Sequence, residues 1–249
     1  MLNPNPQAAP HEDDTKDTNA AADERVALIC PDDIAAAINH IYGGAPLEGY
    51  IPLFAMRDEG DGYRFPIKWF DSRDGLASVI LYAQQLAAQL AAEEQGGQDA
   101  PLSHVAICGC TFGDLKNEKG SRTASEVNII QCRAVCIDHD LNPYASVAKL
   151  REIVAPTFST YSGGFHGVVQ KRHDWIVFDA PLTAKDAHAK LKDAVRRVIK
   201  WCGAGDAALS NLVHPLRCPG SLHRKPSTGF KPSASKIVED GNRVAASMS

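Results

Sequence analysis

Two carboxylates stand at the end of an apolar stretch in the middle of the chain. Asp138 and Asp140 follow residues 133–137, whose Val, Cys and Ile side chains favour a buried β-strand. Since side chains alternate along a strand, both carboxylates project from the same face. Two like charges this close are unfavourable unless something neutralises them, and Mg²⁺ or Mn²⁺ prefers such oxygen ligands. The spacing therefore indicates a divalent metal site, with two solvated acids in a turn as the simpler alternative.

A glycine-rich segment with two polar side chains follows at residues 162–166, Ser-Gly-Gly-Phe-His. Glycines adopt backbone conformations that are closed to other residues, and their N–H groups can line an anion-binding concavity. The Ser162 hydroxyl and the His166 ring add hydrogen-bond donors to the same stretch. The composition suits a phosphate, although an ordinary hairpin turn with a partly exposed histidine would look the same.

A basic segment, Leu-Arg-Cys-Pro-Gly-Ser-Leu-His-Arg-Lys, occupies residues 216–225. Pro-Gly predicts a turn, and the two leucines indicate that the segment is anchored to the core. Forked guanidinium groups and a lysine point charge are typical of phosphate binding, while a basic surface loop is the alternative. The polar residues of the segment are Arg217, Ser221, His223, Arg224 and Lys225.

A further carboxylate, Asp206, could be a third acid near the metal ions. Its alternative role is the N-cap of a short helix over residues 207–211, since Asp is a preferred capping residue. Two acids for metal, a glycine-rich Ser/His segment and an Arg/Lys clamp together favour metal-dependent phosphoryl transfer on a nucleotide. In that reaction the clamp would hold the β- and γ-phosphates and stabilise the leaving pyrophosphate.

The order of these motifs resembles that of the archaeo-eukaryotic primase superfamily, and most of all the primase-polymerase domains of plasmid and phage replication proteins. The motifs are apolar-Asp-x-Asp at residues 137–140, Ser-x-Gly-x-His at 162–166, and Arg-x-Pro-Gly-Ser-x-x-x-Lys at 217–225. The resemblance runs from about residue 133 to residue 225. It implies an RRM-like, mostly antiparallel sheet that carries the catalytic strand over residues 131–226, joined to an N-terminal α/β unit over residues 25–130.

The same resemblance implies a role for each candidate residue. It implies two Mg²⁺ or Mn²⁺ ions, held by the metal ligands Asp138, Asp140 and Asp206. It implies nucleotide contacts from Ser162, Gly164, His166, Arg217, Ser221, His223 and Lys225. Members of the family often have Asn at the position of His223.

These features predict a DNA primase-polymerase that transfers nucleotides from (d)NTP to a 3′-hydroxyl on a single-stranded DNA template, in the replication of a mobile element. A replicative helicase would be a further partner, because many relatives continue into a helicase domain. Two rival interpretations stay open. A metal-dependent nuclease would not need the Arg217/Lys225 clamp, and a non-catalytic protein that binds single-stranded or origin DNA would not need Asp138 and Asp140.

The elements around the motifs predict an α+β fold. The expected helices cover residues 34–41, 72–95, 143–154 and 183–202, and the expected strands cover 51–56, 63–69, 104–110, 133–137, 157–161, 165–170 and 175–178. In the second half, short connections favour an antiparallel sheet with helices on one face. Residues 111–125 are expected to form a loop that moves without substrate. We expect a disordered leader over residues 1–24, a catalytic domain over 25–226 and a flexible tail over 227–249.

Composition places the chain among ordinary globular proteins, with 44% hydrophobic and 22% charged residues. Neither a signal peptide nor a membrane-spanning run is present, so we expect a cytoplasmic protein with no membrane partner and reduced cysteines. The net charge of −4 is unevenly distributed: residues 1–148 hold 10 Lys+Arg against 22 Asp+Glu, and residues 149–236 hold 15 against 6. A polyanionic partner is therefore expected to bind the second half of the chain. The alternative is that the basic residues between positions 185 and 200 are only the solvent-exposed face of a helix.

Several other residues could be read as metal-binding or base-stacking residues, but a role in packing is the simpler expectation. Four cysteines, at positions 108, 110, 132 and 136, lack the spacing of a zinc knuckle, and buried cysteines are common in strands. His139 should face the opposite side of the strand from the two acids, which predicts packing or support rather than metal binding. Trp69 and Trp175 are expected in the core.

Overall fold

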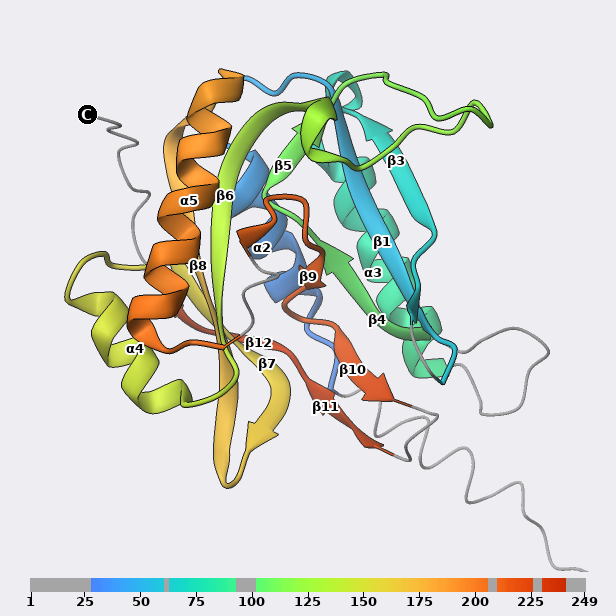
Figure 1. The fold of residues 1–249 in the computed structure, drawn as a ribbon. Coiled ribbons are helices and arrows are strands. Elements are labelled where there is room, and N and C mark those ends of the chain that lie inside the picture. Colours follow the sequence, from blue (N-terminus) through green and yellow to red (C-terminus); the bar gives the residue numbers. More distant parts are fainter. Residues whose placement is uncertain (1–27, 61–62, 93–101, 206–209, 226–229, 241–249) are drawn as a thin grey trace, which may run out of the picture.

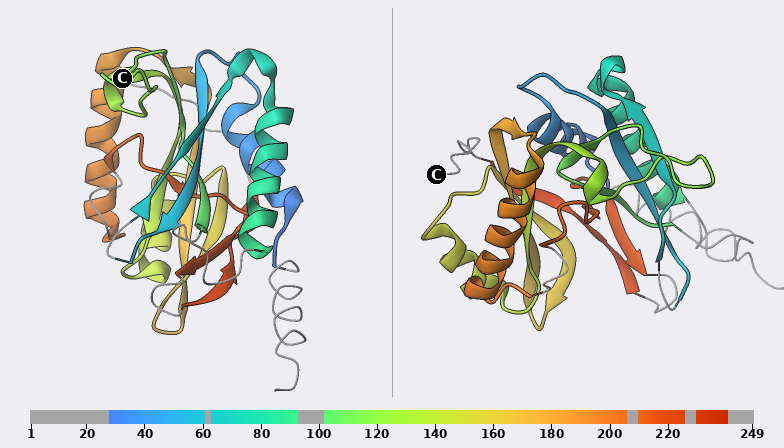
Figure 2. Two further views of the ribbon diagram at one scale, coloured as in Figure 1. Left: turned by 90° about the vertical axis from the view of Figure 1, so that its right-hand side faces the viewer. Right: turned by 45° about the horizontal axis from the view of Figure 1, so that its top comes forward.

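The computed structural model describes residues 28–60, 63–92, 102–205, 210–225 and 230–240. The leader expected over residues 1–24 lies outside these ranges. Within them the chain forms a curved antiparallel sheet flanked by helices, so the predicted α+β class is confirmed (Figures 1 and 2). In the described ranges, no helix is long and apolar enough to cross a membrane.

Among the described residues, four α-helices flank the sheet (Figure 2). Helices α2 and α3 pack against each other on one side, and α4 and α5 pack against each other next to β6 and β8. The buried residues of α5 recur at helical spacing, with Leu191, Val195 and Ile199 on one face, and Gly203 ends the helix in the left-handed region at φ +67°. The helices are α2 (Pro31–Tyr42), α3 (Leu76–Ala92), α4 (Pro143–Arg151) and α5 (Lys185–Cys202).

Ten strands share one sheet, in the order β12-β7-β8-β6-β5-β1-β4-β9, with β2 and β3 attached to β1. A separate ribbon pairs β10 with β11. The two predicted halves of the chain therefore share one sheet. The strands are β1 (Tyr50–Asp58), β2 (Tyr63–Arg64), β3 (Ile67–Asp71), β4 (Leu102–Ile107), β5 (Cys110–Phe112), β6 (Ile129–His139), β7 (Phe158–His166), β8 (Val169–Leu182), β9 (Leu216–Arg217), β10 (Leu222–Lys225), β11 (Phe230–Ala234) and β12 (Lys236–Asp240).

Strand β6 carries the two carboxylates, and its first half is fixed in two ways. The carbonyl of Gly109 accepts hydrogen bonds from both Arg133 N–H and Ala134 N–H, which creates a β-bulge upstream of Asp138. The buried Arg133 side chain donates to four carbonyls at the end of α2, those of Ile41, Gly43, Ala45 and Pro46. Ile41 is in the last turn of α2, where carbonyls have no partner within the helix, and the other three residues lie in the segment that follows, so Arg133 both caps α2 and ties its end to β6.

Two expectations differ from the structure. The turn predicted over residues 162–164 is wrong, because β7 runs through these residues to His166 and the chain reverses at residues 167–168. Residues 230–240, which we expected in a flexible tail, form β11 and β12 instead. Strand β12 is fixed by pairing with β7 and by the hydrogen bond from Ile237 N–H to Asp33 Oδ2 at 3.0 Å.

Candidate active site

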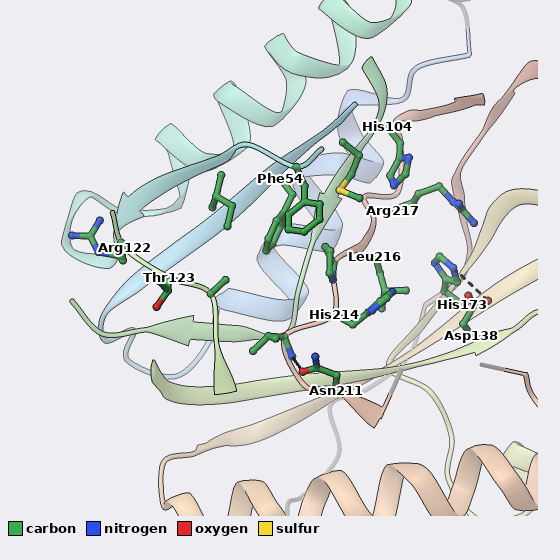
Figure 3. Close-up of a pocket in the computed structure, with 16 residues that line it drawn as sticks. Phe54, His104, Arg122, Thr123, Asp138, His173, Asn211, His214, Leu216 and Arg217 are labelled. Atoms are coloured by element: carbon green, nitrogen blue, oxygen red, sulfur yellow. Dashed lines mark hydrogen bonds and ion pairs between the residues drawn. The ribbon is translucent and has the colours of Figure 1, made fainter. Parts of the chain in front are cut away.

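A cavity of about 860 Å³ lies on the face of β6 that carries Asp138 (Figure 3). Its polar wall includes Asp138 from β6, His173 from β8 and Arg217 from β9. Asp138 and His173 lie directly opposite each other in paired strands, with His173 Nε2 3.6 Å from Asp138 Oδ1. Ligand sites commonly measure about 300–1,000 Å³, so the cavity is large enough for a nucleotide.

The negative charge of Asp138 is stabilised by its neighbours. Burial on its own would raise the pKa of this carboxyl, but the His173 ring and the Arg217 guanidinium outweigh burial and lower the pKa to about 2. Asp138 is therefore ionised at neutral pH although only 13% of its side chain is exposed. An ionised carboxylate is the form that a divalent cation binds.

Several buried polar atoms beside Asp138 have no hydrogen-bond partner within the part of the chain that the structure describes. They are Asp138 Oδ1, both ring nitrogens of His173, Thr160 Oγ1 and Ser162 Oγ. Thr160 pairs with His173, so Asp138, His173 and Thr160 form one row across three strands. Because buried polar groups are nearly always hydrogen-bonded, this row of unsatisfied atoms indicates a surface that receives a polar ligand.

Asp140 lies just beyond the end of β6, where two segments meet it. Its Oδ1 is 3.1 Å from Lys171 Nζ of β8, and its N–H donates to Ala204 O at 2.9 Å. A Cβ on Gly205 would lie 3.3 Å from Asp140 Cβ, so the segment leading to Asp206 is close to the carboxylates. Asp206 itself lies outside the described residues, and its role as a third acid stays a prediction.

The donor atoms at this surface fit a divalent metal ion. Asp138 and Asp140 supply carboxylate oxygens close to each other, and one of them, Asp138 Oδ1, is buried without a hydrogen bond. Mg²⁺ is usually held by one or two carboxylates together with water and substrate phosphates. In the described ranges no group of three or more His, Cys, Asp or Glu residues is arranged around a common point, so a third protein ligand would have to come from elsewhere.

Arg217 projects into the cavity from β9, which is held in place by pairing with β4. Its Nη1 lies 3.4 Å from His223 Nε2, and the His223 ring packs edge-on against His104 at a centroid distance of 5.6 Å. His223 is buried and contacts Arg217, whereas His104 and Arg217 line the cavity. A guanidinium beside the Asp138 carboxylate is suited to hold a phosphate in the same cavity.

The Pro-Gly turn after Arg217 is packed against the start of α2. Gly220 has φ +79°, and a Cβ there would lie 2.1 Å from the carbonyl oxygen of Cys30. The same two residues are joined by a hydrogen bond from Cys30 N–H to Gly220 O at 2.9 Å. The buried Ser221 hydroxyl donates to Cys218 O at 2.6 Å and closes the turn. In this structure, therefore, the turn and Ser221 hold β9 in position.

The other two cations of the basic segment differ from Arg217. Arg224 is buried, and its Nε donates to the carbonyl of Leu102 at 2.7 Å, so it fastens β10 to β4. Lys225 is the last residue of β10, and its side chain is not among those the structure describes. Of the predicted clamp, the structure thus brings Arg217 to the carboxylates.

The glycine-rich segment serves packing in this structure. Gly163 has φ +80°, and a Cβ there would lie 2.8 Å from Ser233 Oγ of β11. A Cβ on Gly164 would lie 3.0 Å from Lys171 Cδ. Gly164 therefore leaves room for the lysine that pairs with Asp140.

His166 does not lie with the other candidate residues. It is exposed at the outer end of β7, paired with Val169, whereas Thr160 pairs with His173. The four residues from Val169 to His173 span about 13 Å at the usual rise of about 3.3 Å per residue. The structure therefore places His173, and not His166, beside the carboxylates.

Sequence reasoning also missed much of the cavity wall. One side of the cavity is apolar and comes from β1 and the β2–β3 segment. Arg122 and Thr123, in the loop that we expected to move, form the end of the cavity farthest from Asp138 (Figure 3). In this structure the Arg122 guanidinium packs 3.4 Å over the Tyr50 ring and donates to Asp114 Oδ1. The unpredicted residues of the wall include His104, His173, Asn211 and His214 on the polar side and Phe54, Met56, Phe65 and Ile67 on the apolar side.

A buried polar network supports β6 from behind. His139 faces the opposite side of the strand from Asp138, as predicted, with Nδ1 2.8 Å from Ser146 Oγ of α4 and Nε2 3.3 Å from Asp174 Oδ2 of β8. Asp174 Oδ1 also accepts a hydrogen bond from Arg172 Nε at 2.9 Å. His139 and Asp174 are fully buried. The network joins α4 and β8 to the strand end that carries the carboxylates.

This network predicts an acid-dependent loss of stability. Burial alone would raise the pKa of Asp174, but hydrogen bonds and the charges of His139 and Arg172 lower it below the usual value near 3.8. A carboxyl whose pKa is lowered on folding stabilises the protein above its unfolded pKa, and that stabilisation is lost as pH falls through the folded pKa. We expect Asp174→Asn to lower the free energy of unfolding by about 3 kcal/mol at pH 7.

Urea unfolding of wild type and Asp174→Asn from pH 7 down to pH 2 measures this effect. The stability difference should stay constant above about pH 4.5 and shrink below it, because the unfolded-state carboxyl then begins to bind a proton while the folded-state carboxyl, with its lowered pKa, is still ionised. Asp179→Asn, an exposed change on the same strand, is the control. A difference that does not change over the whole pH range would contradict the assigned role of the Asp174 charge.

The cysteines of β5 and β6 belong to the core. Cys110 and Cys132 face each other across the two strands, and all four cysteines of this region are buried. Burial raises the pKa of the Cys108 thiol to about 12, and burial together with the Cys132 thiol raises the pKa of Cys110.

Comparison with solved structures identifies proteins of similar fold. The chain is similar to the AEP (archaeo-eukaryotic primase) domain of the primase-polymerase PrimPol of cyanophage S-2L, with a TM-score of 0.57 and 14% sequence identity, covering 88% of this chain and 95% of that one. It also matches the crystal structure of primase RepB′ (TM-score 0.49, 14% identity, 86% and 59% covered) and the catalytic domain of RepB′ in complex with initiator DNA (TM-score 0.49, 14% identity, 86% and 89% covered). The cyanophage likeness shows that the chain has the archaeo-eukaryotic primase fold, as predicted. No family model and no curated protein matches the sequence.

Proposed function

We propose that the chain is a DNA primase-polymerase, which transfers nucleotides from (d)NTP to a 3′-hydroxyl on a single-stranded DNA template. One observation carries the proposal: Asp138 lines a nucleotide-sized cavity together with Arg217 and the unsatisfied His173 ring, and Asp140 lies close to Asp138. The primase fold is consistent with this chemistry, although fold alone does not determine activity. A role in replication of a mobile element, with a helicase partner, is part of the same proposal.

Asp138 and Asp140 would hold two Mg²⁺ or Mn²⁺ ions, with Asp206 as the third ligand. When bound, such ions supply Lewis-acid stabilisation of the transferring phosphoryl group and favour ionisation of the 3′-hydroxyl. The surrounding residues hold both carboxylates in position. Lys171 Nζ lies 3.1 Å from Asp140, and His173 lies opposite Asp138 in the paired strand.

The chain itself would bind and orient the nucleotide. Arg217 would hold the β- and γ-phosphates, because a guanidinium donates two parallel hydrogen bonds to phosphate oxygens. His173 and Thr160 present unsatisfied polar atoms on the same face and would contact the remaining phosphate oxygens. The apolar side of the cavity, with Phe54 and Phe65, would exclude water and face the base.

Substitution of Arg217 tests the nucleotide-binding part of this proposal. We expect Arg217→Ala to weaken dNTP binding about 10- to 100-fold in the presence of Mn²⁺, since a charged hydrogen-bonding group is lost, and Arg217→Lys to retain part of the affinity. Isothermal titration calorimetry measures both.

Arg197→Ala is the charge-matched control, because Arg197 is exposed on α5. Circular dichroism should show the same fold for all three variants. Unchanged dNTP affinity in Arg217→Ala would contradict the clamp and leave the nuclease as the better interpretation.

A further inference from the structure

A second groove, of about 510 Å³, lies between α4 and the outer part of the β7–β8 hairpin, on the other side of the sheet from Asp138. Figure 1 shows α4 beside the ends of these two strands. Arg172, which lines the groove, pairs with His139 in the neighbouring strand, and paired residues point to the same face of a sheet. Because His139 faces away from the catalytic cavity, the groove lies on the opposite face of the sheet from that cavity. The groove is lined by Tyr144, Val147, Arg151, Tyr161, Gln170 and Arg172, among others.

The wall of this groove combines aromatic rings with positive charge. Tyr144 on α4 and Tyr161 on β7 contribute rings from opposite walls, and two arginines and an amide complete the polar part. None of the described residues that line the groove is a carboxylate. Tyr144 is 82% exposed, which leaves a large apolar ring in water. Aromatic rings that stack bases, with arginines that neutralise phosphates, are the composition of single-strand nucleic-acid sites.

The groove is also close to the catalytic carboxylates and fixed relative to them. Tyr144 follows Asp140 by four residues, and four residues span about 14 Å at most. Arg172 donates through Nε to Asp174 Oδ1, which belongs to the network behind β6. This hydrogen bond holds the arginine side chain in place at the groove. A DNA strand bound here would therefore pass near the active site in a defined position.

We propose that the groove binds an unpaired nucleotide of the single-stranded DNA, with its base stacked on Tyr144 and its phosphate at Arg151. The inference rests on the proposed function, which requires a single-stranded template, and adds a contact outside the catalytic cavity. The excess of positive charge in residues 149–236, with 15 Lys+Arg against 6 Asp+Glu, favours a polyanion here. An acidic peptide would use the arginines but would leave the two rings without a role.

Fluorescence anisotropy with a labelled oligothymidylate of about 12 nucleotides tests this site, since single-strand sites cover about 4–16 nucleotides. We expect Tyr144→Ala to raise the Kd about 5- to 100-fold and Tyr144→Phe to leave it within about twofold, because the ring is kept. Arg151→Ala should raise the Kd and reduce the dependence of log Kd on log salt by about 0.7. Lys190→Ala, which removes an exposed cation from α5, should change the Kd less than Arg151→Ala does.

The outcomes separate this inference from the proposed function. Equal affinities of wild type, Tyr144→Ala and Arg151→Ala would overturn the groove site alone and leave template binding in the cavity intact. A wild-type protein that does not bind single-stranded DNA at any salt concentration would overturn both. If Tyr144→Ala weakened binding of free dAMP but not of the oligonucleotide, the assignment to a DNA strand would be overturned.

Discussion

Replacement of Asp138 by asparagine is expected to reduce nucleotide incorporation roughly a thousandfold or more, because it removes the charge that we propose to bind the metal ions of the reaction. Asparagine has the same shape and keeps one oxygen, so packing around β6 should be preserved. The Asp138 carboxylate is ionised, with a pKa of about 2, because the His173 ring and the Arg217 guanidinium stabilise its negative charge. The substitution therefore removes a charge and leaves the cavity otherwise unchanged.

Primer extension with labelled dNTP and Mn²⁺ measures this loss, and a Mn²⁺ titration followed by thermal unfolding gives a second readout. Wild type should be stabilised by Mn²⁺, whereas Asp138→Asn should lose most of that stabilisation. Asp179→Asn, an exposed change on β8, should behave as wild type in both measurements. Incorporation by Asp138→Asn above about a tenth of the wild-type rate would show that Asp138 is not a metal ligand of the reaction.

Gly220→Ala is expected to have the second large effect, a loss of about 3 to 4 kcal/mol in the free energy of unfolding. Two costs add at this position. The φ of +79° disfavours a side chain, and the new Cβ would lie 2.1 Å from Cys30 O and 2.8 Å from Ile34 N at the start of α2. Since Cys30 N–H also bonds to Gly220 O, relief of the clash would separate α2 from the turn that holds Arg217.

Gly167→Ala is the matched control for this change. Gly167 has φ +60°, and a Cβ there would have no heavy atom within 4 Å among the described residues. Urea unfolding should therefore show a loss of about 1 kcal/mol for Gly167→Ala, which reports the backbone cost alone. If the two alanine variants were equally stable, the close packing of the Pro-Gly turn against α2 would be refuted.

Strand β6 and its two carboxylates were predictable because the signal is local. A short apolar run that ends in Asp-x-Asp specifies a strand and the common face of both acids without knowledge of the rest of the fold. Arg217 was identifiable in the same way, from its position beside a Pro-Gly turn. The packing of that turn against the start of α2 was not predictable, because its contact with Cys30 joins residues far apart in the chain.

The histidine beside the carboxylates could not be assigned from local pattern. Ser-x-Gly-x-His at residues 162–166 predicted His166, but β7 continues through the glycines and the hairpin reverses only at residues 167–168. The register of β6 and β8 then sets His173 opposite Asp138. Local pattern gave no signal for it, because residues 170–174, Gln-Lys-Arg-His-Asp, are all polar and lack the alternation of a half-buried strand. His173 lies in the sheet because β8 extends through these polar residues to pair with β6 and β7.

The C-terminal strands were missed for a related reason. Residues 230–240 read Phe-Lys-Pro-Ser-Ala-Ser-Lys-Ile-Val-Glu-Asp, a run with little hydrophobic alternation. Their structure depends on partners elsewhere: β12 pairs with β7, and Ile237 N–H bonds to Asp33 Oδ2. Such long-range pairing decides strand formation more than local propensity does.

Nucleotide incorporation by the purified chain on single-stranded DNA tests the central claim most directly. The assay offers labelled dNTPs or NTPs with Mn²⁺ or Mg²⁺, on a bare template and on the same template with an annealed primer. We expect products that lengthen with time and are absent with Asp138→Asn, on the bare template for a primase and on the primed one for a polymerase. No product under any condition with DNA binding intact would contradict the enzyme and leave a binding protein, whereas shortening of the template would indicate a nuclease.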